Sequence, residues 1–170
     1  MERETALAEF DRSRDAFLDA LGPAPDQALG YLREGDIYAI GGLAVHCNWV
    51  LRHYHRVLDG LASGGGTELR TSDPDGEQDE ANRRALAGLT AEQRAPELAE
   101  LKALHEQVRQ AASGIAPEAW ERKTPVFYGD AAEAYPTSPD DVIGWLRDHY
   151  QEHVPHATDL LAEWQSTRDR

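Results

Sequence analysis

The stretch from Val142 to Leu160, VIGWLRDHYQEHVPHATDL, indicates the fold class and carries the most informative chemistry of the chain. One track through it begins and ends in apolar residues and holds three histidines between them. Its members are Val142, Leu146, His149, His153, His156 and Leu160. Their alternating intervals of four and three residues are typical of an α-helix with one buried face. We predict that this last helix has Ser138 as its N-cap and Pro139 in its first turn, and that it runs to about Gln165.

Similar periodicity upstream predicts an all-α fold. The expected helical segments are residues 4–21, 41–61, 79–89 and 91–112, the last entered through a capping box of Thr90 and Gln93. Residues 63–79, SGGGTELRTSDPDGEQD, predict an exposed, mobile crossover loop. Residues 123–139 are expected to be loop-like, with a short extended piece at 126–128. The sequence therefore predicts one domain over residues 1–170, a four-helix bundle with a long crossover between helices two and three.

The composition restricts the kinds of molecule that this protein is expected to bind. The chain has 170 residues, with 31 Asp plus Glu against 17 Lys plus Arg and a net charge of -14. Such a charge repels phosphate groups and argues against nucleic-acid or anionic membrane partners. The single cysteine, Cys47, excludes an intramolecular disulfide and fits a reducing cytoplasm. The N-terminus lacks the apolar core of a signal peptide, and no apolar run is long enough to predict a membrane span.

The histidines suggest a metal site. His149 and His153 are four residues apart, which places their Cβ atoms roughly 5–6 Å from each other on one helix face. His46 occupies the apolar face of the helix over residues 41–61, between Leu43 and Val50. If these two helices face each other, His46, His149 and His153 can hold a divalent metal ion and leave coordination positions open for water or substrate.

Alternatives remain for individual histidines. A histidine on an apolar face is usually a core residue with one hydrogen bond, and this reading stays open for His46. The pair His149 and His153 favours a metal, because protonation without one would put two like charges side by side. Pro155 favours a break of the helix at Val154 over a bend that aims His156 at the site. His156 is then a candidate for orienting one of the metal-binding histidines. The pattern assigns no role to His53 or His105.

Other reactive residue types are expected to be structural. Cys47 projects about 100° around the helix from His46, which favours a buried packing role. Asp148 could either orient an imidazole or be solvated, and Glu152 lies on another helix face, so no H-E-x-x-H motif is present. The tryptophans are predicted to pack rather than to form a ligand cage. They are Trp49, Trp120, Trp145 and Trp164.

The order of these motifs resembles a known family. Tyr38 precedes His46 by eight residues, and the last helix carries His149-x3-His153 followed by His156. In this order the motifs are similar to those of the DinB/YfiT-like superfamily over nearly the whole chain. The sequence departs from the usual pattern in having tyrosine for the more frequent tryptophan and Ala39 for the usual serine N-cap.

The resemblance implies a metal-binding four-helix bundle in which His46, His149 and His153 hold a divalent ion such as Zn, Ni, Fe or Mn. Several relatives look like transferases or isomerases that use a bacterial low-molecular-weight thiol, whose pKa a metal lowers. We therefore expect a thiol-dependent transferase or isomerase that acts on a small electrophile. The alternatives are a metal-dependent hydrolase and a non-enzymatic stress-response bundle with a structural metal or none. Homodimerisation is expected by analogy.

Overall fold

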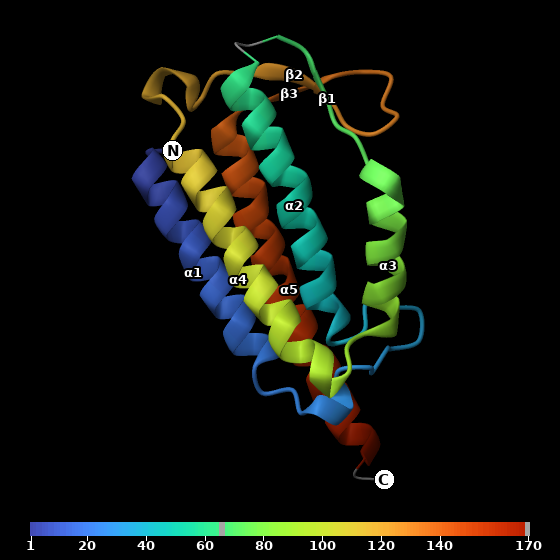
Figure 1. Cartoon of the computed structure of the whole chain (residues 1–170). Helices are drawn as coiled ribbons and strands as arrows, with labels where there is room; N and C mark the ends of the chain where they lie inside the picture. Colours follow the sequence, from blue (N-terminus) through green and yellow to red (C-terminus); the bar gives the residue numbers. More distant parts are fainter. Residues whose placement is uncertain (65–66, 169–170) are drawn as a thin grey trace.

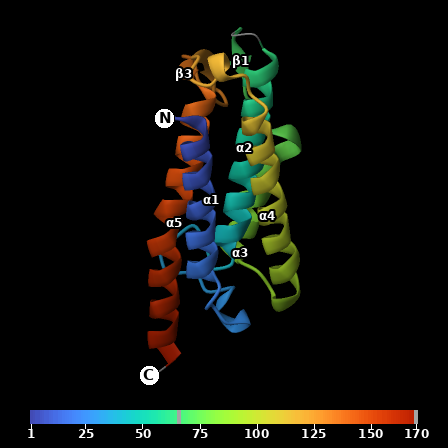
Figure 2. The ribbon, with the colours of Figure 1, turned by 90° about the vertical axis from the view of Figure 1, so that its left-hand side faces the viewer.

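Five helices account for most of the computed structural model, which describes residues 1–64 and 67–168. They are α1 (Arg3–Leu21), α2 (Gly42–Ser63), α3 (Glu77–Ala87), α4 (Ala91–Ser113) and α5 (Pro139–Arg168). Helices α1, α2, α4 and α5 lie side by side, and α3 packs along the outside of α2 (Figures 1 and 2). The predicted all-α four-helix bundle is confirmed.

The chain passes through the bundle in an unusual order. Helix α1 packs chiefly along α5, and α2 chiefly along α4. The two helices of each pair run in the same direction (Figure 1). Helices α2 and α4 can do so because α3 returns the chain along the bundle before α4 begins. The predicted long crossover after α2 is thus present, but it contains strand β1 (Leu69–Arg70) and is not loop throughout. Gly65 and Gly66, part of that predicted loop, lie outside the described residues.

A small sheet lies across one end of the bundle (Figure 1). Strand β1 pairs in parallel with β2 (Thr124–Phe127), and β2 pairs antiparallel with β3 (Tyr135–Thr137). The short extended piece expected at 126–128 corresponds to the end of β2, whose Val126 is fully buried. Strands β1 and β3 were not expected from the sequence, because strands of two or three residues owe their conformation to the partner they pair with.

Side-chain caps position two of the helices. Thr90 and Gln93 form the predicted capping box at α4, with the Thr90 N–H donating to Gln93 Oε1 at 2.9 Å. At the start of α5 the Ser138 N–H donates to Asp141 Oδ2 at 2.7 Å, and the Asp141 N–H donates to Ser138 Oγ at 3.3 Å. Ser138 is therefore the N-cap of α5, and it sets where this helix begins.

Helix α5 continues through Pro155, so the predicted break at Val154 is wrong. Proline removes one backbone hydrogen bond from a helix interior. The turns beyond it offset that cost, because Ala157, Leu160 and Leu161 are buried against the core. Continuity of α5 keeps His156 on the same face as His153.

The N-terminus of α2 is held tightly against α3. A Cβ atom on Gly42 would lie 1.7 Å from the carbonyl oxygen of Ala85, so only glycine permits this approach. The Ala39 N–H also donates to this carbonyl oxygen at 2.9 Å. These contacts fix the first turn of α2, and His46 follows one turn later.

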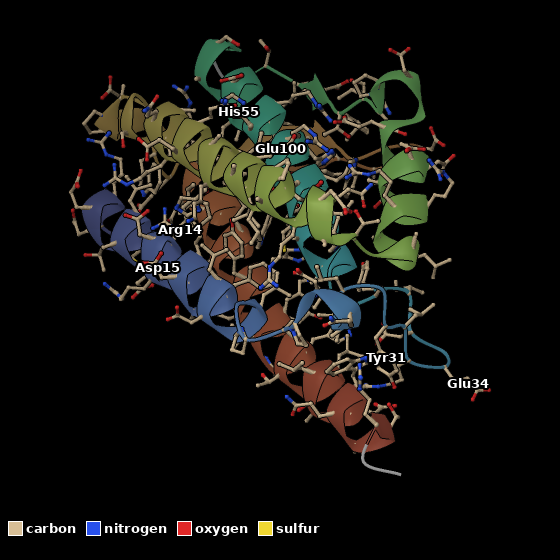
Figure 3. All side chains as sticks on the ribbon, turned by 60° about the horizontal axis from the view of Figure 1, so that its bottom comes forward. Arg14, Asp15, Tyr31, Glu34, His55 and Glu100 are labelled. Atoms are coloured by element: carbon tan, nitrogen blue, oxygen red, sulfur yellow. The ribbon has the colours of Figure 1, made fainter. Side chains whose placement is uncertain are left out.

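Charged side chains cover the outside of the bundle. Asp15 is exposed on α1 and accepts from the half-buried Arg14, and Glu34 lies at the tip of the loop between α1 and α2 (Figure 3). Tyr31 of the same loop reaches the C-terminal part of α5, where its hydroxyl donates to Glu163 at 2.9 Å.

Among the described residues, no helix combines the length and apolarity that a membrane span needs.

Candidate metal centre

Three histidines from two helices meet inside the bundle. His46 of α2 and His149 and His153 of α5 each place one ring nitrogen within 4.8 Å of the other two. The ring centroids are 4.9 Å apart for His46 and His149, 5.3 Å for His46 and His153, and 4.6 Å for His149 and His153. The structure thus brings together the three residues that the sequence singled out as metal ligands.

Two nitrogens of this cluster have unmet hydrogen-bonding capacity. Nε2 of His149 and Nε2 of His153 are buried, and neither has a hydrogen-bond partner within the described chain. A buried polar atom without a partner costs about 1–3 kcal/mol. Nitrogens that share a tetrahedral metal ion at about 2.0–2.1 Å lie about 3.4 Å from each other. Small side-chain rotations would bring the three nitrogens to this spacing, so the cluster fits a divalent metal ion.

The electrostatic environment keeps these histidines neutral. Burial lowers the pKa of His46 to about 4, with the neighbouring His149 and His156 adding to the effect. Burial and the adjacent imidazoles likewise lower the pKa of His153 to about 3, and burial lowers the pKa of His149. A neutral imidazole keeps a lone pair available, which is the form that binds a metal ion.

Tyr38 stands beside the cluster. Its ring stacks on His46 with centroids 4.4 Å apart, and its hydroxyl oxygen lies 3.3 Å from His46 Nε2. The eight-residue spacing between Tyr38 and His46 therefore corresponds to direct contact between the two side chains. Burial raises the pKa of Tyr38, so its hydroxyl keeps its proton and can donate a hydrogen bond at the site.

A chain of hydrogen bonds orients His153. His156 Nε2 lies 2.8 Å from Asp36 Oδ2, and His156 Nδ1 lies 3.4 Å from His153 Nδ1. Burial raises the pKa of Asp36, but hydrogen bonds from His156 and from the N–H groups of Tyr38 and Ile37 outweigh it and lower the pKa overall. The ionised carboxylate accepts from His156 Nε2–H. In its neutral form His156 then accepts at Nδ1 from His153 Nδ1–H.

This tautomer assignment leaves the lone pair of His153 on Nε2, the buried atom for which residues 1–64 and 67–168 provide no hydrogen-bond partner. A hydrogen bond at the far ring nitrogen is the usual way in which proteins orient a metal-binding histidine. His156 thus contacts His153 from the position that an orienting residue would occupy, and it does so without a break in α5.

The sequence suggested Asp148 as a carboxylate that could orient an imidazole, but the carboxylate in this network is Asp36. Asp148 is exposed and accepts from Arg147 Nε at 2.7 Å, so it does not orient an imidazole. Asp36, in the loop before α2, was missed. Its only local signal is turn formation, since Asp36 Oδ1 accepts from the N–H of Ile37 at 2.8 Å. Glu152 is exposed and outside the cluster, as expected.

The remaining histidines divide into two environments. His53 lies two turns beyond His46 on α2, and Trp49 lies between them, with ring centroids 6.4 Å from His46 and 5.4 Å from His53. The indole N–H of Trp49 is buried and has no partner among the described residues. His105 lies elsewhere, fully buried in the core, where it stacks on Phe10 at 3.9 Å.

Cys47 is buried, and burial raises the pKa of its thiol. It is not part of the histidine cluster, in agreement with the predicted packing role. The tryptophans pack as predicted, and the buried Trp120 donates from Nε1 to the Met1 carbonyl oxygen at 3.0 Å. Trp49 differs from the others because it lines the space between two histidines.

The bundle and its three-histidine cluster define a class: helical-bundle proteins with a candidate metal centre between facing helices. A family model described as the DinB superfamily matches residues 9–157. The chain belongs to the DinB superfamily, which confirms the resemblance seen in the sequence.

Solved structures share the fold at low sequence identity. YfiT from Bacillus subtilis, described as a probable metal-dependent hydrolase with an unusual four-helix bundle topology, superimposes with a TM-score of 0.75 and 14% identity, over 96% of this chain and 88% of that one. The mycothiol-dependent maleylpyruvate isomerase gives a TM-score of 0.67 and 11% identity over 91% of this chain. This chain spans 60% of the isomerase. No curated protein matches by sequence.

Proposed function

We propose that this protein is a metal-dependent enzyme in which His46, His149 and His153 hold a divalent ion, and that a small-molecule thiol attacks a small electrophile there, in a transferase or isomerase reaction. The observation that carries the proposal is the convergence of three neutral imidazoles, two of which present a buried Nε2 that has no hydrogen-bond partner among the described residues.

A bound divalent ion lowers the pKa of a coordinated thiol or water, so that the anion exists at neutral pH. The side chains around it supply the rest. Three nitrogen ligands leave room for a further ligand, His156 and Asp36 hold His153 in the required tautomer, and the Tyr38 hydroxyl can donate a hydrogen bond to a molecule bound beside His46.

The thiol has to come from outside the chain. Cys47 is the only cysteine, and it is buried with a raised pKa and lies outside the cluster. A thiol-dependent reaction therefore requires a low-molecular-weight thiol as co-substrate. The principal alternative is hydrolysis by an activated water, which the likeness to the Bacillus subtilis protein over most of its length favours.

We extend the proposal to the domain organisation, the cellular compartment and the oligomeric state of the protein. Residues 1–170 would form one domain that works in the cytoplasm on small molecules, as a monomer or a homodimer. Its net charge of -14 disfavours nucleic acid as a partner, and its one buried cysteine suits a reducing compartment.

Metal analysis tests the first part. The purified protein is expected to contain about one divalent ion per chain, and a His149→Ala, His153→Ala double variant almost none. His55→Ala is the matched control, because His55 lies on the opposite face of α2 from His46 and should leave the metal content unchanged. Equal metal content in the wild type and the double variant would rule out the centre.

Reaction assays test the second part. Consumption of a small electrophile should depend on both added metal and added thiol, and a chelator should abolish it. A reaction that needs the metal but not the thiol would identify a hydrolase. A metal-loaded protein with no reaction in either assay would support the non-enzymatic alternative.

A further inference from the structure

Tyr38 lies beside both helices that carry the candidate metal ligands. Its ring stacks on His46 of α2, with centroids 4.4 Å apart and 29° between the ring planes. The same ring meets His153 and His156 of α5 edge-on, at centroid distances of 5.6 Å and 6.0 Å. Tyr38 is half-buried, so it borders the histidine cluster and keeps part of its side chain in contact with solvent.

The backbone holds this ring in place without the help of the hydroxyl group. The Tyr38 N–H donates to Asp36 Oδ1 at 3.2 Å, and the N–H of the next residue, Ala39, donates to the Ala85 carbonyl oxygen at 2.9 Å. Ala39 and Ile40 are fully buried, which anchors the chain on the C-terminal side of Tyr38 in the core. The hydroxyl is therefore not needed to position the side chain and remains available to a ligand.

The hydroxyl group lies next to the lone pair of His46 but does not occupy it. The lone pair of an imidazole nitrogen lies in the plane of its ring. The hydroxyl oxygen of Tyr38 is 3.3 Å from His46 Nε2, and because the two rings stack, it approaches this nitrogen from above the ring plane. A metal ion can thus bind in the ring plane of His46 while the hydroxyl lies beside the ion.

The imidazole N–H groups next to Tyr38 are already engaged. His156 Nε2–H donates to Asp36 Oδ2 at 2.8 Å, and His153 Nδ1–H donates to His156 Nδ1 at 3.4 Å. Neither group can also donate to a molecule at an open coordination position. Among the described residues, His46 Nε2 is the one hydrogen-bond contact of the Tyr38 hydroxyl. Once a metal ion takes the lone pair of that nitrogen, the O–H can turn to a further acceptor.

The charge of the centre determines which acceptor suits this hydroxyl. Three neutral imidazoles do not offset the charge of a divalent ion, so the open position favours an anion. A thiolate sulfur keeps lone pairs after it binds a metal ion and can accept a hydrogen bond. A neutral ligand such as free imidazole uses its one available lone pair on the ion and has none left to accept.

We propose that Tyr38 is a specificity-determining residue of the metal centre, whose hydroxyl donates a hydrogen bond to a small anion at the open coordination position and so favours anions over neutral ligands. The inference rests on the metal centre of the proposed function but not on its reaction. In the proposed reaction, this anion is the thiolate of the co-substrate.

The experiment uses full-length protein loaded with Co²⁺, whose visible absorption reports the binding of added ligands without turnover. Azide is the anionic probe, because it keeps lone pairs after it binds the ion, and free imidazole is the neutral probe. Tyr38→Phe keeps the stacked ring and removes only the hydroxyl. It should weaken azide binding about tenfold, the size expected for one hydrogen bond to a charged group, and change imidazole binding less than about twofold.

Tyr54→Phe is the matched control, because it removes a hydroxyl from a tyrosine of α2 that packs against Tyr128 and Trp145. This variant should bind azide as the wild type does. Unchanged azide binding in Tyr38→Phe would overturn the proposal. An equal loss of azide and imidazole binding, or loss of Co²⁺ itself, would show that Tyr38 only supports the packing of the centre, and would overturn it as well.

Failure of this inference is distinguishable from failure of the proposed function. If Co²⁺ binds at the histidines and Tyr38→Phe discriminates between azide and imidazole, but no thiol-dependent reaction is found, the role of Tyr38 stands and the proposed reaction fails. If the protein is an active thiol-dependent enzyme and Tyr38→Phe binds azide normally, the role of Tyr38 fails alone. A protein that takes up no Co²⁺ would contradict both.

Discussion

Asp36 and His156 are 120 residues apart in the chain, yet their side chains meet at 2.8 Å beside the histidine cluster. Through His156, one carboxylate determines which nitrogen of His153 carries the proton and which keeps a lone pair. Asp36 therefore belongs to the machinery of the candidate site, although it is not within reach of a metal ion as a ligand in the cluster.

We predict that Asp36→Asn weakens metal binding about 10- to 100-fold, because the amide no longer imposes one tautomer on His156 and His153. Competition titration with a chelator measures this. Asp148→Asn is the control, since Asp148 is next to His149 in the chain but is exposed and paired with Arg147. In metal-free protein, ¹⁵N shifts of the ring nitrogens should show His153 protonated at Nδ1, and a change of tautomer in Asp36→Asn. Equal metal affinity and unchanged tautomers would contradict this role.

At the scale of the elements, a second histidine network ties α4 to α1 and α5. His105 Nε2 pairs with Asp11 Oδ1 at 2.9 Å, and its Nδ1 lies 3.5 Å from the Tyr150 hydroxyl. Arg109 Nε also donates to Asp11, at 3.1 Å. The ring of His105 stacks on Phe10 and has no exposed surface. These contacts make His105 a packing residue that joins three helices.

His105→Ala should therefore lower the free energy of unfolding by about 2–4 kcal/mol, through the cavity it leaves and the hydrogen bonds it removes. Chemical denaturation of the metal-free protein measures this loss. Metal stoichiometry should not change, because His105 is not part of the histidine cluster. If His105→Ala lost its metal while its free energy of unfolding stayed unchanged, His105 would belong to the metal site and not to the core.

At the scale of the whole molecule, the buried histidines make the stability depend on pH. Burial lowers the pKa of His46 to about 4 and of His153 to about 3, and it also lowers that of His149, whereas an unfolded chain has histidines near 6.5. Below pH 6.5 the unfolded state then binds more protons than the folded state. Stability consequently falls as the pH is lowered from about 6.5 towards 4.

For the metal-free protein we expect the free energy of unfolding to fall by up to about 1.4 kcal/mol per pH unit for each histidine that stays neutral in the fold. Denaturant titrations between pH 7.5 and 4.5 in a chelator measure the slope. A variant with glutamine at positions 46, 149 and 153 should show a flatter profile, because it has lost these titrating groups. A wild-type profile without slope over this range would show that the cluster does not stay neutral.

Local patterns were sufficient to predict the helices and part of the site. The helical period located α1, α2, α4 and α5, and the capping residues Thr90 and Ser138 marked two helix starts. The pairing of His149 with His153 also follows from local geometry, because residues four apart on a helix share a face. Such features depend on hydrogen bonds and side chains within a few residues of each other.

The tertiary structure decided everything that joins distant segments. It carried α5 through Pro155, paired β1 with β2, brought His46 against α5 and placed Asp36 on His156. A proline or a two-residue strand has no strong local preference for these states, and burial against the rest of the core stabilises them. The sequence alone therefore determined the helices and the spacing of the histidines, whereas packing between distant segments determined which of these side chains meet.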